Sequence, residues 1–223
     1  EQVKSLQATS AGAGGPIVLV ECESEWNSGL ETLANSYIGE LIRYIREAGI
    51  SVPIINSNNL WQGVEGQIDG WSGSQELLAT TRQLASVRMN QPRVVIDFSA
   101  TSPLLWGQEP ETPPTPMMQQ RALAEVLAGG GQYNIRPFCG GTNFGFWGGR
   151  AVGASDQFYA AEFGRGAPIA DSGVQGPSYA AIRRLNHFAS RFSRVLSNLD
   201  PAFQPVMIDP TAVVPEGKAT KGA

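Results

Sequence analysis

The chain has 223 residues, enough for one large domain or two small ones, and its 42% hydrophobic and 16% charged residues are ordinary for a globular protein. A formal net charge of −4 argues against nucleic acid as a partner. No apolar run approaches the roughly 18 residues that cross a bilayer, so no membrane span is expected. Two cysteines and one histidine argue against a disulfide framework, a histidine-based metal site or a Ser-His-Asp triad.

The N-terminal residues 1–15 have neither the charged start nor the apolar stretch of a signal peptide. They are predicted to be the end of a helix that stops at glycines. The chain is therefore expected to begin within a fold, and its first residues leave the compartment undetermined.

Beyond these residues, short apolar runs alternate with amphipathic segments. Strands are predicted at 17–20, 52–58, 67–71, 93–98 and 133–139, and helices at 33–48, 75–89, 117–128 and 179–196. A proline-rich loop is predicted at 101–116 and a surface tail after Pro201. Strands that alternate with helices predict an α/β fold with a parallel sheet and right-handed crossovers.

Polar residues stand at the carboxyl ends of the predicted strands: Glu25, Asn56, Asn58, Asp69 and Asp97. Active sites are built at this end of the strands both in (β/α)8 barrels and in open doubly wound sheets. The chain has no phosphate-binding glycine motif between a strand and a helix, so nothing in it points to nucleotide chemistry.

Glu25 and Asp97 are the two strand-end acids that stand out as a possible catalytic pair. Glycosidic bond cleavage needs two carboxylates: one protonates the leaving oxygen, and the other attacks the anomeric carbon or activates water. A separation of about 5–5.5 Å gives retention and about 6.5–9.5 Å gives inversion. The alternative is that both acids only cap strands and bind water.

Four segments carry a resemblance to a known family. They are GGPIVLVECESEW (14–26), QPRVVIDFSATSPLLWG (91–107), RPFCGGTNFGFWGG (136–149) and GAPIADSGVQGPSYAAIRRL (166–185). In this order they resemble the motifs GGPIIxxQxENEYG, PLxxSEFYxGWxDxWG, MFxGGTNFGFWNG and DAPLxEAGxxTxKYxALRxL of the glycoside hydrolase family 35 β-galactosidases. The third match is the most specific, and the four together cover nearly the whole chain.

The resemblance implies a (β/α)8 TIM barrel of which this chain holds roughly strands 4 to 8 with their helices. Residues 1–200 would be the C-terminal part of the barrel and 201–223 an extended tail or linker. Five strands cannot close an eight-stranded barrel. The first three strands are therefore expected from a second polypeptide, from an upstream part of the same gene product or from self-association. The family also favours a secreted or periplasmic location.

The resemblance implies a retaining glycoside hydrolase with Glu25 as the acid/base and Asp97 as the nucleophile, acting on a glycoside that need not be a galactoside. No metal or organic cofactor is implied, because two carboxylates and water suffice. The family's nucleophile is a glutamate, and the shorter Asp97 withdraws the carboxylate by about 1.5 Å. A misplacement of that size can cost roughly 10²-fold in rate.

Other positions are predicted to bind the substrate. Glu23 matches a supporting glutamate of the family, whereas Ser24 replaces its asparagine and both Ser99 and Arg136 replace tyrosines. Asn143 is a hydrogen-bonding candidate, and Trp106 and Trp147 are candidate platforms for a sugar face. Because several sugar contacts are replaced, the alternative is a degenerate barrel that serves as a carbohydrate-binding or structural subunit.

The remaining predictions concern packing. Phe144 and Phe146 are expected to pack their loop against the barrel rim, and Cys22 and Cys139 are expected to be buried free thiols within strands. An extended backbone would place Glu21, Glu23 and Glu25 on one face. Three neighbouring acids repel one another, so at least one should be protonated, paired or bent away.

Overall fold

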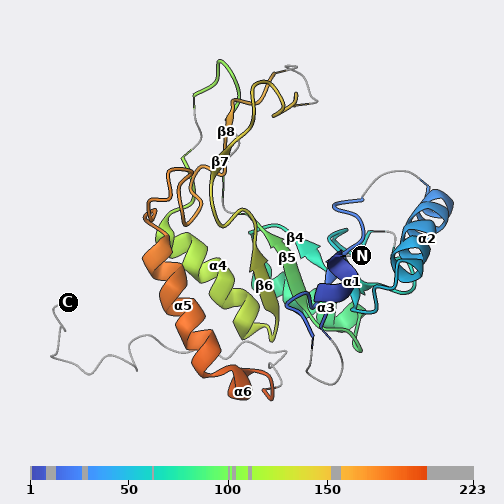
Figure 1. Ribbon diagram of the computed structural model, residues 1–223. Coiled ribbons are helices and arrows are strands. Elements are labelled where there is room, and N and C mark those ends of the chain that lie inside the picture. The colour runs from blue at the N-terminus through green and yellow to red at the C-terminus, as the bar shows by residue number, and fades with distance from the viewer. Residues whose placement is uncertain are drawn as a thin grey trace, which may run out of the picture.

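The computed structural model describes residues 2–8, 14–26, 30–61, 63–99, 101, 104–109, 112–151 and 157–199. These residues form helices α1 (Gln2–Leu6), α2 (Glu31–Glu47), α3 (Leu77–Val87), α4 (Pro116–Ala128), α5 (Tyr179–Arg191) and α6 (Ser193–Leu196). The strands are β1 (Val20–Glu21), β2 (Ile54–Asn56), β3 (Ile68–Asp69), β4 (Trp71–Ser72), β5 (Val94–Phe98), β6 (Gln132–Ile135), β7 (Gly141–Thr142) and β8 (Glu162–Phe163). The predicted mixed α/β fold is thus confirmed (Figure 1).

Two parallel sheets follow one another along the chain. The first has the order β1-β2-β3 and the second the order β4-β5-β6. Only Gly70 separates β3 from β4, so the predicted third strand is one extended stretch that pairs with β2 at its start and with β5 at its end. The strands therefore neighbour one another in chain order, as the alternation of strands and helices predicts.

Gly70 is the residue at which the stretch stops pairing with β2 of the first sheet and begins to pair with β5 of the second. Its N–H donates to the carbonyl oxygen of Asn56 at 2.9 Å. A Cβ atom at this position would lie 2.3 Å from that same oxygen, which is inside van der Waals contact with rigid backbone. Only glycine therefore lets the stretch pass this close to β2.

We expect Gly70→Ala to lower the free energy of unfolding by about 1–3 kcal/mol, because the methyl group forces β2 and the β3–β4 stretch apart. The measurement is urea unfolding followed by circular dichroism. Gly39→Ala is the matched control: Gly39 lies inside α2 with nothing within 4 Å of a built Cβ, so the same change should be neutral or stabilising by up to about 1 kcal/mol. Equal effects at the two positions would contradict the proposed close approach.

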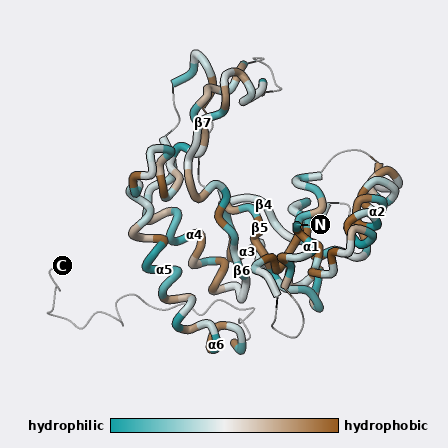
Figure 2. The backbone as a smooth tube through the Cα atoms, in the orientation of Figure 1, coloured by the Kyte–Doolittle hydropathy of each residue, from teal (hydrophilic) through white to brown (hydrophobic). Residues whose placement is uncertain are grey.

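The main core lies between the second sheet and the helices that follow its strands. Its fully buried side chains are Leu77, Val95, Phe98, Leu123, Val126 and Ile182, with Leu185 nearly so. They come from α3, β5, α4 and α5, which explains why these helices pack side by side over the sheet (Figure 1). Figure 2 shows the same helices with mixed hydrophobic and hydrophilic residues along their length, the pattern of elements that cover a core on one side only.

Two features differ from the sequence-based expectation. The predicted helix 179–196 is interrupted at Phe192, which separates α5 from α6. The antiparallel pair β7 and β8, joined at Gly141–Phe163 and Thr142–Glu162, was not predicted because each strand has only two residues. This pair and its loops project from the main body as a separate lobe (Figure 1). The predicted tail 201–223 lies outside the described residues.

Candidate active site

A buried polar cluster occupies the carboxyl ends of β2 and β3. Asn56 donates from Nδ2 to Asp69 Oδ1 at 2.8 Å, and its Oδ1 accepts the N–H of Asn58 at 3.0 Å. The other oxygen of Asp69 forms an ion pair with Nε of Arg88. Both oxygens of the Asp69 carboxylate are therefore engaged within the fold, which assigns this acid to structure.

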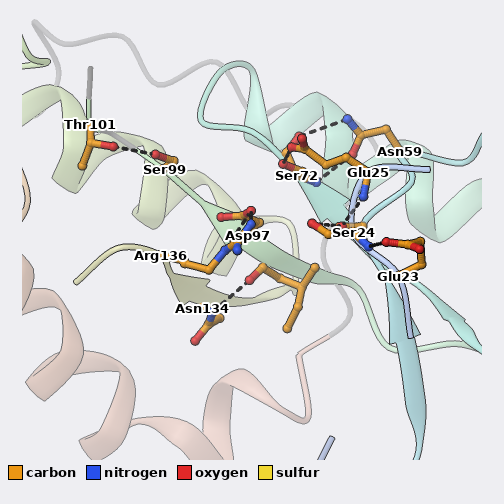
Figure 3. A network of polar contacts seen from close by, with 12 residues as sticks. Glu23, Ser24, Glu25, Asn59, Ser72, Asp97, Ser99, Thr101, Asn134 and Arg136 are labelled. Carbon is orange, nitrogen blue, oxygen red and sulfur yellow. Dashed lines mark hydrogen bonds and ion pairs between the residues drawn. The ribbon is translucent and has the colours of Figure 1, made fainter. Parts of the chain in front are cut away.

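Glu25 follows β1 at a turn in the chain. Its backbone has a left-handed φ of +54°, and its N–H donates to Ser57 Oγ at 3.0 Å. The Glu25 side chain points to β4, where Oε1 accepts a hydrogen bond of 2.5 Å from Ser72 Oγ (Figure 3). Residues other than glycine rarely adopt this left-handed backbone conformation, and they keep it only where neighbouring contacts fix it. The backbone turn thus aims the Glu25 carboxylate at the second sheet.

Asn59 holds Ser72 in place. The Asn59 side chain accepts the backbone N–H of Ser72 at 2.7 Å and donates to its carbonyl oxygen at 3.1 Å, as a neighbouring strand would (Figure 3). Sequence reasoning missed both residues. The signal was available, since Asn59 ends the polar run after β2 and Ser72 lies at the carboxyl end of β4.

The three acids after the first apolar run do not share one face. Glu23 Oε2 accepts a hydrogen bond of 2.8 Å from the hydroxyl of Tyr37 on α2, and Glu23 Oε1 accepts the N–H of Ser24 at 3.0 Å. The bond to Glu23 raises the pKa of the Tyr37 hydroxyl. The turn at Glu25 ends the extended alternation, so one acid is paired and another is bent away, as their mutual repulsion predicts.

Asp97 lies at the end of β5 with only 6% of its surface exposed. Arg136, just after β6, donates from Nε to Asp97 Oδ2 at 3.0 Å, and its Nη2 forms an ion pair with the same oxygen (Figure 3). This bond raises the pKa of the Arg136 guanidinium, and the charges of Glu21 and Glu25 act in the same direction. The guanidinium therefore lies within electrostatic reach of the acids at the ends of both sheets.

The other predicted substrate-binding residues fall into two places. The Ser24 hydroxyl lies 3.5 Å from Ser57 Oγ, beside the site of Glu25. Ser99 pairs its hydroxyl with that of Thr101 at 2.9 Å, and both residues line a cavity of about 370 Å³ together with Asn143. This cavity lies between the end of β5 and the lobe of β7 and β8.

Four aromatic residues in and beside the lobe are largely exposed. Trp147 is 83% exposed and Trp106 is 63% exposed, which leaves both rings open to a ligand. Phe144 and Phe146 are 85% and 88% exposed, so the prediction that they pack against the rim is wrong. The GGTNFGFWGG segment forms a tight turn at 145–148, and such a turn directs its side chains outward.

The two free cysteines differ in exposure. Cys22, just after β1, is only half-buried and Cys139 is exposed, so the prediction of two buried thiols is wrong. Burial, and secondarily the charge of Glu23, raises the pKa of the Cys22 thiol. A raised pKa leaves less of the reactive thiolate at a given pH.

We expect iodoacetamide at pH 7 to label Cys139 roughly ten times faster than Cys22, as measured by peptide mapping at successive times. The labelling rate at Cys22 should still be rising at a pH above the ordinary thiol pKa, because the raised pKa of Cys22 means that its thiolate forms only at higher pH. Labelling of Cys22 first would contradict the partial burial of this thiol.

Glu25 and Asp97 thus lie at the carboxyl ends of parallel strands in neighbouring sheets, and a pair of carboxylates is what glycosidic bond cleavage requires. The sequence model of glycosyl hydrolases family 35 matches residues 1–189, and the chain belongs to this family.

Curated relatives extend the comparison. A beta-galactosidase of Canis lupus familiaris is 25% identical over 202 residues, covering 86% of this chain and 29% of the relative. Beta-galactosidase 8 of Oryza sativa subsp. japonica is 26% identical over 190 residues, covering 78% and 28%. The human beta-galactosidase-1-like protein 2 is 29% identical over 143 residues, covering 61% and 22%. The chain thus spans about 30% of the length of the first two relatives.

Two absences hold for the described part of the chain. No helix there is long and apolar enough to cross a membrane. The same residues contain no group of three or more His, Cys, Asp or Glu side chains that could hold a metal ion.

Proposed function

We propose that this protein is a retaining glycoside hydrolase related to β-galactosidases, with Glu25 as the acid/base and Asp97 as the nucleophile. The proposal rests on membership of glycosyl hydrolases family 35 and on the positions of these two residues in the family motifs. Its substrate is a glycoside that need not be a galactoside, because Ser24, Ser99 and Arg136 replace residues of the family pattern.

One observation carries the proposal. Each of the two carboxylates has one oxygen held and one oxygen uncommitted among the described residues. Asp97 Oδ2 is bound by Arg136, and Glu25 Oε1 accepts the hydroxyl of Ser72. A carboxylate that attacks or transfers a proton needs one fixed oxygen for orientation and a second oxygen that reaches the substrate.

The proposed reaction has two steps. Asp97 Oδ1 attacks the anomeric carbon while protonated Glu25 gives its proton to the leaving oxygen, which yields a glycosyl-enzyme ester and a free alcohol. Glu25, now a carboxylate, takes a proton from water as the water oxygen attacks the anomeric carbon, and Asp97 leaves with its electron pair. Arg136 orients Asp97 throughout, in the place where the family pattern has a tyrosine.

We also infer that the two sheets are part of a (β/α)8 barrel, roughly its strands 4 to 8. The parallel strands that neighbour one another in chain order support this inference. In the described residues β1 pairs only with β2, and β6 only with β5, so two parallel edges remain available for further strands. A second polypeptide, an upstream part of the gene product or another copy of the chain would supply them.

A second function is favoured by the ion pair itself. A carboxylate bound by a guanidinium through two nitrogens is a weaker nucleophile than a free carboxylate, and Asp97 is also shorter than the family's glutamate. The alternative is therefore a barrel that binds carbohydrate, or acts as a structural subunit, without turnover.

The test is mass spectrometry of the intact protein after incubation with 2-deoxy-2-fluoro-glycosides of several sugars, which trap a covalent glycosyl-enzyme. An adduct of one fluorosugar, mapped by peptide digestion to Asp97, is the expected result and identifies the sugar. Binding of these sugars without adduct or turnover would replace the hydrolase with the binding function.

A further inference from the structure

Three consecutive polar residues at the end of β2 are buried without a charged or apolar residue between them. Asn56, Ser57 and Asn58, here called the buried polar run, have at most 1% of their surface exposed. Polar side chains lose their water when they are buried, and a fold keeps them only where hydrogen bonds replace it. The partners of the buried polar run therefore show what the fold uses it for.

Two of these hydrogen bonds fix the backbone on both sides of Glu25. Ser57 Oγ accepts the N–H of Glu25 at 3.0 Å, and Asn58 Oδ1 accepts the N–H of Trp26 at 2.7 Å. These N–H groups belong to the two planar peptide units that flank the Glu25 Cα atom. With both planes held, the backbone angles of Glu25 are set, including its left-handed φ of +54°, and so is the direction in which its side chain leaves the chain.

The buried polar run is itself anchored to the end of α3. The N–H of Asn58 donates to Asn56 Oδ1 at 3.0 Å, and Asn56 Nδ2 donates to Asp69 Oδ1 at 2.8 Å. The other oxygen of Asp69 forms the ion pair with Arg88, the residue that ends α3. An unbroken series of polar contacts thus connects this ion pair to the backbone that carries Glu25.

Helix α2 holds the residues before and after the turn. The Tyr37 hydroxyl donates to Glu23 Oε2 at 2.8 Å, and the Tyr37 ring lies with its centroid 4.9 Å from that of Trp26. Because Tyr37 contacts both residues, loss of a hydrogen bond from the buried polar run should change the turn between them and leave the rest of the segment in place.

We propose that Ser57 and Asn58 are positioning residues for the acid/base Glu25, with the Asp69–Arg88 ion pair as their anchor. The inference rests on the proposed function and deepens it. A general acid must come within hydrogen-bond reach of the leaving oxygen, and a misplacement of about 1 Å can cost roughly 10²-fold in rate. Ser57 and Asn58 act through the Glu25 backbone, so their effect is confined to proton transfer to and from the substrate.

The experiment measures kcat/KM of Ser57→Ala and Asn58→Ala in the full chain on methyl and 2,4-dinitrophenyl β-galactosides and on the corresponding β-glucosides. The methyl leaving group needs a proton and the dinitrophenyl group does not. We expect each variant to lose about 10–10²-fold on the methyl glycoside and less than about threefold in formation of the glycosyl-enzyme from the dinitrophenyl glycoside. A merely structural role would lower both rates alike, because it reduces the amount of folded protein.

Ser86→Ala is the matched control, since the Ser86 hydroxyl is exposed on α3 and bonds only to the carbonyl oxygen of Arg82 within that helix. It should change neither rate. Circular dichroism shows which variants fold, and Ser57→Ala, which removes a single oxygen, tests the proposal even where Asn58→Ala fails to fold.

A loss confined to the methyl glycosides, in either variant, supports the positioning role. Unchanged rates, or equal losses on both leaving groups in every variant that folds, would overturn it and leave the hydrolase proposal standing. The hydrolase proposal fails separately: Glu25→Gln would then show no dependence on the leaving group, or the unmodified protein would turn over none of the four glycosides, and this inference would fall with it.

Discussion

Glu25→Gln should lower kcat/KM on a glycoside with an alkyl leaving group by about 10²–10⁴-fold, because the amide cannot protonate the leaving oxygen. With a dinitrophenyl glycoside, the variant should slow formation of the glycosyl-enzyme much less, because this leaving group departs without a proton. The hydrogen bond from Ser72 Oγ to Glu25 Oε1 can be made equally to an amide oxygen, so the variant should fold. Steady-state and burst kinetics on the two substrates separate these effects.

The control for this prediction is Glu21→Gln, an equal change of charge on β1 that removes another contributor to the field at Arg136. It should change kcat/KM by less than about tenfold. A Glu25→Gln variant that retains full activity on both substrates would remove Glu25 from the mechanism.

Arg136→Met should lower the free energy of unfolding by about 1–3 kcal/mol, and Asp97→Asn by less. The two side chains of this ion pair differ in exposure: that of Asp97 is 8% exposed and that of Arg136 is 57% exposed. Removal of the guanidinium leaves a buried carboxylate without its partner, which costs the desolvation of that charge. Removal of the carboxylate leaves a guanidinium that water solvates. Urea unfolding of both variants measures the asymmetry.

The double variant Arg136→Met with Asp97→Asn completes the cycle and should be more stable than Arg136→Met alone. Equal destabilisation by the two single variants would contradict the difference in burial between the Asp97 carboxylate and the Arg136 guanidinium. In activity, Asp97→Asn should abolish the covalent adduct with fluorosugars, since an amide cannot form the ester. Arg136→Met should still form it, but roughly 10²-fold more slowly, because the attacking group loses its orientation.

The regular part of the fold was predictable because its signals are local. The amphipathic periods that predict helices at 33–48, 75–89 and 117–128 correspond to α2, α3 and α4, with ends that differ by at most two residues. The apolar strand 93–98 corresponds to β5 in the same way. Each of these segments buries a face along most of its length, and such a face is visible in sequence.

The site was predictable only in part, because its geometry depends on contacts between distant segments. The identity of Glu25 and Asp97 as strand-end acids follows from sequence, and their catalytic roles stay a prediction. The left-handed turn at Glu25 has no sequence signal, since glycine and asparagine are the usual residues there. The pairing of Asp97 with Arg136, 39 residues apart, follows from the neighbouring positions of β5 and β6.

The lobe was the least predictable region for a related reason. Its strands β7 and β8 have two residues each, too short for any alternation to be visible. Phe144 and Phe146 look like core residues by type, and only the tight turn that carries them shows that they face solvent.

The stretch from β3 to β4 connects the two parallel sheets as well as pairing with a strand of each. Glu25 follows the first sheet and Asp97 ends the second, so the gap between the two carboxylates is spanned by five residues that change partner at Gly70. Asp97 ends β5, which pairs with β4, and Glu25 follows β1, which pairs with β2, the partner of β3; the backbone at Gly70 therefore helps to set the separation of the two carboxylates. The stereochemical outcome of glycoside cleavage depends on a difference of only a few ångströms in this gap. In the proposed hydrolase, a backbone position that touches no sugar would therefore influence whether cleavage retains or inverts the anomeric configuration.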